Sequence, residues 1–273
     1  MKRSIAPAAA FGVVLLLCCA LVPAKGAAQT WAELSKRMTD DCAKFSRDIE
    51  DMTLTLDMSV PSSDGAMTSK SVLYRKGNRF RAEVSMEGMA EAGAPAGMAA
   101  MKTIVISDGT NVWIIAPMLG KSQIPPDEGK KYSGQWTCSD YIPADAQVIG
   151  SETIDGRACY VLSVLDASSD VAKLWIDQKD LSLLKMVGKE KEGEAMTALF
   201  SDFRKIVGDL DLAYKTELYS GGDLIMTTTI TSVEINKGLA DDLFDPDKVK
   251  VEGADMLKMM KQAMDTIKTK QVD

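Results

Sequence analysis

The feature that most constrains the fold is a long succession of strand-length segments with no helical segments between them. Residues 52–60 alternate strictly, with Met52, Leu54 and Leu56 on one side and polar residues on the other, which is typical of a strand with one buried face. Further strands are predicted up to residue 75 and at 79–86, 103–107, 111–116, 148–154, 158–165, 171–177, 182–188, 194–204, 210–219 and 225–235. We therefore expect a mainly β (α+β) fold in which these strands form a large curved antiparallel sheet.

Such a sheet would leave an apolar face uncovered, so the sequence must also supply a cover. Residues 31–49 repeat apolar side chains at three- and four-residue steps and predict a helix. Residues 88–101 are rich in Ala, Gly and Met and contain no β-branched residue, which predicts a mobile loop or short helix inserted between strands. A tail helix is expected at 254–268. We expect these three segments to cover the sheet as a helical lid.

The first 28 residues have the pattern of a cleaved signal peptide. A basic start precedes an apolar run, and small residues end at Ala28, just before Gln29. The alternative is a membrane-anchored lipoprotein modified at Cys18 or Cys19, but no small residue precedes either cysteine directly. The predicted organisation is a signal peptide at 1–28, a half-barrel domain at 29–246 and a Met-rich helical tail at 247–273, with the mature protein in the periplasm.

The net charge of the chain limits the classes of partner that it can bind. Without the basic residues of the signal peptide, 29 basic residues face 39 acidic ones, which gives a net charge of about −10. Nucleic-acid binding draws its affinity from neutralising phosphates with basic groups, so this balance argues against it. We expect a monomer without a nucleic-acid partner.

Three cysteines remain after the predicted cleavage, at Cys42, Cys138 and Cys159. An oxidising compartment favours one disulfide and one leftover thiol. We expect the pair Cys138–Cys159, because both residues flank a predicted sheet region; the alternative is three separate buried thiols.

The chain lacks the residues on which most catalysis depends. It contains no histidine, which removes the commonest general base and transition-metal ligand. No nucleophile motif or phosphate-binding glycine loop is present, and the three cysteines that remain after the predicted cleavage lie far apart in the sequence. We expect a protein that is not an enzyme, with no metal and no cofactor.

Residues 73–80, 104–117, 173–177, 200–205 and 243–244 together resemble a known family. The first stretch places Arg75 before a turn and Phe80 after it, and the second contains Ser107-Asp108-Gly109 followed by Trp113 and a proline. This arrangement is similar to the LolA family of periplasmic lipoprotein carriers and to the wider family of outer-membrane lipoprotein-sorting proteins. The resemblance implies an unclosed, LolA/LolB-like β-barrel whose concave apolar face binds acyl chains beneath a helical lid.

The resemblance further implies that Arg75 holds the lid and that Phe80 lies near it. We expect the cavity and lid to comprise Met52, Leu54, Leu56, Arg75, Phe80, Met89, Met98, Ile104, Ile106, Trp113, Ile115 and Trp175. Methionine suits an adaptable apolar pocket because it is unbranched and polarisable. The alternatives are that the methionines fill an ordinary core, that Arg75 is a surface arginine paired with an acid, and that the two tryptophans belong to the core.

Together these features predict a carrier of lipoprotein acyl chains or other lipids. It would deliver them to an outer-membrane acceptor. One alternative is a sensor of lipoproteins that acts through an inner-membrane partner protein, and another is a structural module whose core is filled.

Overall fold

One antiparallel sheet of thirteen strands dominates the computed structural model, which describes residues 30–63, 65–85, 102–117, 120–125, 142–165, 169–189, 195–208 and 210–249. Within these residues the elements are α1 (Trp31–Asp48), β1 (Asp51–Ser62), β2 (Gly65–Lys76), β3 (Arg79–Ser85), β4 (Lys102–Ser107), β5 (Val112–Ala116), β6 (Gly120–Ile124), β7 (Ala146–Ile154), β8 (Arg157–Val164), β9 (Val171–Asp177), β10 (Leu183–Gly188), β11 (Met196–Val207), β12 (Leu210–Ser220), β13 (Asp223–Ile235) and the short 3-10 helix η4 (Asp241–Phe244).

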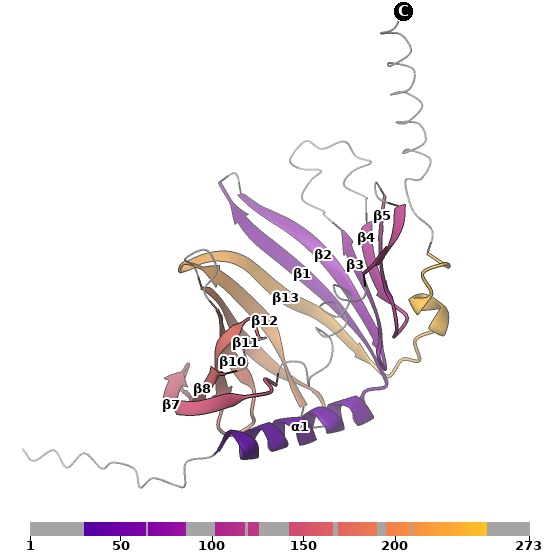
Figure 1. Cartoon of the computed structure of the whole chain (residues 1–273). Helices are drawn as coiled ribbons and strands as arrows, with labels where there is room; N and C mark the ends of the chain where they lie inside the picture. The colour runs from indigo at the N-terminus through magenta and orange to yellow at the C-terminus, as the bar shows by residue number, and fades with distance from the viewer. Residues whose placement is uncertain are drawn as a thin grey trace, which may run out of the picture.

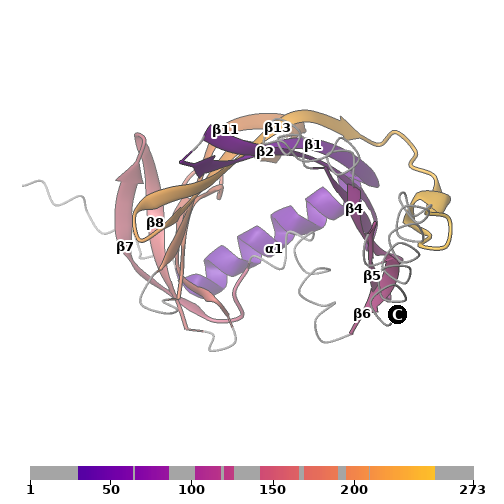
Figure 2. The same ribbon diagram turned by 90° about the horizontal axis from the view of Figure 1, so that it is seen from above.

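The sheet consists of two meanders joined at its centre (Figure 1). The strand order is β6-β5-β4-β3-β2-β1-β13-β12-β11-β10-β9-β8-β7, so the first and last strands of the chain pair in the middle and β6 and β7 form the two edges. Seen from above, the sheet bends into an arch that does not close (Figure 2). The predicted curved antiparallel sheet is therefore confirmed. One of the thirteen strands, β6, was not predicted, because its sequence Gly-Lys-Ser-Gln-Ile shows too little apolar alternation to be recognised.

Asp-Gly turns join β7 to β8 and β4 to β5. Asp155 and Gly156 both have positive φ, of 49° and 78°, as a tight two-residue turn between antiparallel strands requires. At the turn between β4 and β5, the Asp108 carboxylate accepts hydrogen bonds from the amides of Thr110 and Asn111, and Gly109 has a φ of 97°. Local sequence thus sets the two hairpins, β4–β5 and β7–β8.

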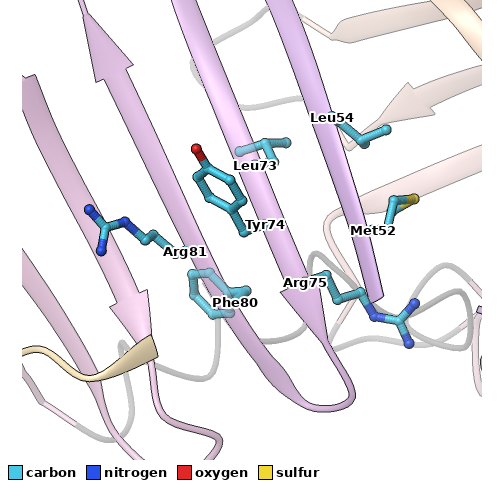
Figure 3. Close-up of a pocket in the computed structure, with 7 residues that line it drawn as sticks. All are labelled: Met52, Leu54, Leu73, Tyr74, Arg75, Phe80 and Arg81. Carbon is cyan, nitrogen blue, oxygen red and sulfur yellow. The ribbon is translucent and has the colours of Figure 1, made fainter. Parts of the chain in front are cut away.

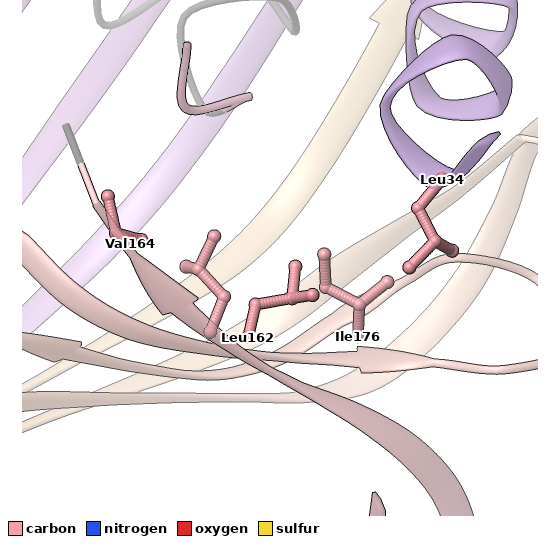
Figure 4. Packing of buried hydrophobic residues seen from close by; sticks show 5 residues of the cluster. Leu34, Leu162, Val164 and Ile176 are labelled. Carbon is pink, nitrogen blue, oxygen red and sulfur yellow. The ribbon is translucent and has the colours of Figure 1, made fainter. Parts of the chain in front are cut away.

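The helix α1 crosses one end of the arch: it lies inside the arch seen from above (Figure 2) and along the lower end of the strands in Figure 1. It begins with a capping box, in which Thr30 and Glu33 satisfy each other's backbone amides. Its buried side chains, Leu34 and Cys42, lie on one stripe with Phe45. Leu34 packs onto Leu162 and Ile176 of the sheet (Figure 4). The predicted N-terminal helix is confirmed and covers part of the inner face.

A buried carboxylate ties the start of β1 to the end of β13. Asp51 accepts hydrogen bonds from the amides of Lys237, Gly238 and Leu239 at 2.8–3.1 Å. Burial by itself raises the pKa of Asp51, but these three amides stabilise the charged form and lower the pKa below its usual value. The central strand pair is thereby fixed at the end where α1 joins the sheet.

The expected disulfide Cys138–Cys159 is wrong, because Cys159 is a free thiol buried under the outer surface of β8. Cys42 of α1 is the described cysteine that takes part in a disulfide, and Cys138 lies outside the described residues. The sequence argument considered which cysteines flank the sheet, but the side of the strand to which Cys159 points decides its environment.

Several predictions concern residues outside the described ranges. These are the signal peptide with its cleavage after Ala28 and before Gln29, the 88–101 segment with Met89 and Met98, and the tail helix at 254–268. Among the helices in the described part of the chain, none combines the length and the apolar character needed to cross a membrane.

Candidate functional site

The register of the sheet assigns each strand residue to the concave or the convex face. Directly opposed residues of antiparallel strands point to the same side. Phe45 of α1 lies over Arg75 of β2, with 5.1 Å between the guanidinium carbon and the ring centre, which places Arg75 on the concave face. Arg75 is opposed by Met52 on one side and Phe80 on the other, so these residues share that face.

Five predicted site residues lie together on the concave face. They are Met52, Leu54, Leu56, Arg75 and Phe80, from the neighbouring strands β1, β2 and β3. In Figure 3 Met52, Leu54 and Arg75 point to one side of the sheet, whereas Arg81 points to the other.

The other five described site residues lie on the convex face, which corrects their expected position. Ile104, Ile106 and Ile115 form a cluster covered by Val249, after the last strand. Trp113 opposes Ile106, so it also faces outward. Trp175 packs on the convex face with Cys159 and Leu184, and its indole donates to Glu152. The physical reason is that β4, β5 and β9 carry apolar residues on both faces, so alternation alone does not identify the inner one.

The middle of the concave face is apolar and only half-buried. β1, β13 and β12 place a broad set of apolar side chains of intermediate exposure there: Met52, Leu56, Met58, Met226, Val233, Ile235, Leu212, Tyr214 and Leu218. The buried clusters of this face lie to either side, around Leu34 and Leu162 on one flank and around Phe80 and Val112 on the other. Among the described residues, the fold thus leaves its central apolar face incompletely packed.

Two small cavities lie at the sheet, and the first has lining residues from both of its faces. One, of about 10 Å³, is lined by Met52, Leu54, Leu73, Tyr74, Arg75, Phe80 and Arg81. The other, of about 70 Å³, is lined by Pro143, Val164, Ser169, Val171, Leu174, Leu183 and Met186. Each has space for no more than a few water molecules. Neither cavity is lined by a residue of α1.

Arg75 is the unusual polar residue of the concave face. Its side chain is 93% buried, since only 7% remains exposed, and its Nε and Nη1 have no hydrogen-bond partner in the described part of the protein. Burial lowers the pKa of this guanidinium. The same strand face carries Ser71, whose buried hydroxyl also lacks a partner.

The convex face carries a wider cleft of different chemistry. It has a volume of about 330 Å³ and lies between β5 and the segment around η4, with Trp113 and Phe244 among its walls and four aspartates at its edge. Asp241 is already paired with Lys76 and Arg79, and Asp247 with Lys121. This open, polar cleft is unsuited to a purely apolar ligand.

Sequence reasoning missed several concave-face residues. Phe45 and Leu34 belong to the site because α1 lies over the sheet, and only the three-dimensional structure shows this contact. Leu212 and Leu218 of β12 also lie on the concave face by the register of the sheet. Across the described residues, no group of three or more acidic, cysteine or histidine side chains is arranged to hold a metal ion.

Comparison with known proteins identifies the fold. No protein-family model matches the chain, and no curated protein is significantly similar to it in sequence. Among solved structures, a DUF1329 family protein from Desulfovibrio piger is similar, with a TM-score of 0.59 and 16% identity over 81% of this chain and 98% of that one. A putative outer membrane lipoprotein-sorting protein domain from Vibrio parahaemolyticus has a TM-score of 0.56 and 14% identity, covering 77% and 96% of the two chains. A LolA superfamily protein from Nitrosomonas europaea has a TM-score of 0.52 and 16% identity, covering 79% and 99%.

These similarities show that the chain has the unclosed β-barrel fold of LolA-like proteins. The resemblance seen in residues 73–80 and 104–117 is therefore confirmed at the level of the fold.

Proposed function

We propose that this protein is a periplasmic, non-enzymatic carrier that binds the acyl chains of lipoproteins or other lipids on its concave face. The observation that carries the proposal is the half-buried apolar surface of β1, β12 and β13 under the arch. Each buried methylene group contributes about 0.8 kcal/mol, so a long acyl chain laid on such a surface binds without needing a polar contact.

The position of α1 supports a lid in this proposal. Leu34 anchors one end of the helix on β8 and β9, and Phe45 meets Arg75 nearer the other end. The two small cavities are not lined by α1, so the acyl chain would lie along the half-buried apolar surface of β1, β12 and β13. The helix would then cover the end of the bound chain that lies near Phe45 and Leu34. An outer-membrane acceptor that binds the chain more strongly would take the cargo.

Gentle purification from the native periplasm tests this function. Native mass spectrometry followed by lipid extraction should find co-purifying acyl chains on the wild-type protein. In a matched variant, Leu56→Asp places a charge in the middle of the concave face and should abolish the lipid signal, whereas Asp57→Asn, on the exposed convex side of the same strand, should leave it unchanged. A wild-type protein that carries no lipid and binds no added acyl probe would refute the carrier.

The lipoprotein sensor remains the alternative within the same fold. It predicts a stable complex with an inner-membrane protein, which a carrier does not require. Crosslinking in cells, followed by isolation of the protein, separates the two, because a carrier gives transient complexes that depend on bound lipid.

A further inference from the structure

Unpaired polar atoms are concentrated on one face of one strand. In the described residues, the three buried side-chain nitrogen or oxygen atoms without a hydrogen-bond partner are Nε and Nη1 of Arg75 and Oγ of Ser71. Both residues lie on the concave face of β2, because Ser71 opposes Leu56 and Arg75 opposes Met52. Buried polar groups in proteins are nearly always paired, so this concentration marks a place where a partner from outside the fold is expected.

Arg75 differs in this respect from other arginines of the sheet. Three arginines on the convex face are paired with carboxylates, at N–O distances of 2.7–2.9 Å: Arg79 with Asp241, Arg81 with Glu83, and Arg157 with Asp177. Arg75 is more deeply buried than these residues, and within the described part of the chain its guanidinium lies against the Phe45 ring and not against a carboxylate. Burial lowers the pKa of Arg75, and no neighbouring carboxylate opposes this by raising it.

The surroundings of Arg75 define what such a partner must be. A guanidinium keeps its charge in proteins, so a buried one without a counter-ion is stabilised most by an anion. Its neighbours Met52, Leu54 and Leu73 are apolar and line the same small cavity (Figure 3). A ligand that satisfies both conditions has an anionic oxygen head and an apolar chain. The limited space beside Arg75 favours a small head on a single chain.

We propose that Arg75 binds the anionic head group of a single-chain amphiphile, a carboxylate or a phosphate, whose acyl chain lies on the concave face. This inference rests on the proposed lipid-binding function and adds a charge requirement to it. The head would accept hydrogen bonds from the guanidinium N–H groups, and the chain would follow β1 and β2 past Leu54 toward Leu56. The cargo class therefore includes fatty acids and lysophosphatidic acids, in addition to neutral acyl groups.

Matched pairs of ligands test the charge requirement. The uncharged fluorescent probe N-phenylnaphthylamine is bound to the full mature protein and displaced by oleate or methyl oleate, and in a second series by lysophosphatidic acid or monoolein. The wild type should bind the charged member of a pair at least about ten times more tightly than the neutral one. The pair with the larger ratio shows whether a carboxylate or a phosphate is the preferred head.

Variants at Arg75 assign the preference to this residue. Arg75→Met should bring the charged-to-neutral ratio close to one while methyl oleate still displaces the probe, and Arg75→Lys should retain part of the preference. Arg47→Met removes the same charge from an exposed position on α1 and should keep the wild-type ratio. If Arg75→Met fails to bind the probe, the ratio for Arg75→Lys against Arg47→Met decides the matter.

The outcomes separate this inference from the proposed function. Equal binding of charged and neutral ligands by the wild type, or a full preference retained in Arg75→Met, overturns the role of Arg75 and leaves the lipid carrier intact. No binding of the probe or of any of the four ligands by the wild type overturns the carrier itself, and the charge requirement with it.

Discussion

Replacing Arg75 with methionine should stabilise the lipid-free protein, which is the opposite of the usual result of a core mutation. Each buried donor without a partner costs about 1–3 kcal/mol, and Arg75 has two. The substitution also loses the contact with Phe45, which is worth about 0.5–2 kcal/mol. Methionine fills a similar space without a polar atom. We therefore expect the free energy of unfolding to rise by about 1–3 kcal/mol.

Thermal unfolding of delipidated protein, followed by circular dichroism, measures this effect. In a domain of this size 1 kcal/mol shifts Tm by about 2–4 °C, so the variant should melt about 2–12 °C higher than the wild type. Oleate added to both should reduce the difference, because only the wild type gains a partner for its guanidinium.

Arg81→Met is the matched control, since Arg81 is a half-buried arginine on the next strand that has partners. It pairs with Glu83 at 2.7 Å and donates to the Leu243 carbonyl at 3.1 Å. Its loss should lower the free energy of unfolding by about 1–3 kcal/mol. If Arg75→Met lowers Tm as Arg81→Met does, Arg75 is a satisfied structural cation and the reasoning is refuted.

Three further predictions concern the lid, acid stability and the cysteines. Leu34→Ala should lower the free energy of unfolding by about 2–4 kcal/mol and speed release of a bound apolar probe in stopped-flow fluorescence; unchanged release would argue against α1 as the lid. The pKa of Asp51 is lowered in the folded protein, so the carboxylate stabilises the fold fully above about pH 4, and this stabilisation is lost as the pH falls through the folded-state pKa. In the Asp51→Asn variant the urea midpoint of unfolding should therefore fall less steeply below about pH 4 than in the wild type. The same pH dependence in both proteins would contradict this. Peptide mapping without reduction should find Cys42 in a disulfide-linked peptide. Cys159 should react with iodoacetamide only after denaturation, because burial raises the pKa of its thiol and blocks access to it. Fast labelling of Cys159 in the native protein would count against the structure.

The architecture could be predicted from the sequence because it depends on local patterns. The alternation of residues 52–60 and the Asp155-Gly156 turn each specify a strand or a hairpin on their own. Their number and the lack of intervening helices then require a large antiparallel sheet. The pairing of β1 with β13 closes the longest loop in the fold and leaves no such local mark, so it could not be predicted in this way.

The face of the sheet on which a candidate residue lies was predicted correctly where one face of a strand is apolar and incorrectly where both are. In β1 polar residues alternate with Met52 and Leu54 along the strand, and this alternation shows which side faces inward. In β4, Ile104 and Ile106 alternate with Val105, which is also apolar, so either face was possible. Ile104 and Ile106 face the convex side, where Val249 packs against them. This contact joins residues more than 140 positions apart in the sequence, so no local pattern predicts it.

Geometry makes lid closure and head-group binding at Arg75 compatible rather than competing. A guanidinium offers its flat face to an aromatic ring and its N–H groups in the plane of the group. Phe45 of α1 lies against Arg75 as a ring contact, whereas Nε and Nη1 are left without acceptors. An anionic head can therefore bind at the edge of the guanidinium while α1 remains over its face. The unpaired donors of Arg75 are costly only while Arg75 is buried, and α1 helps to bury it. An anionic head that pairs with these donors removes this cost, so its binding favours the closed position of the helix. A neutral acyl chain lacks this coupling, so the charge of the cargo would set how firmly the lid stays shut.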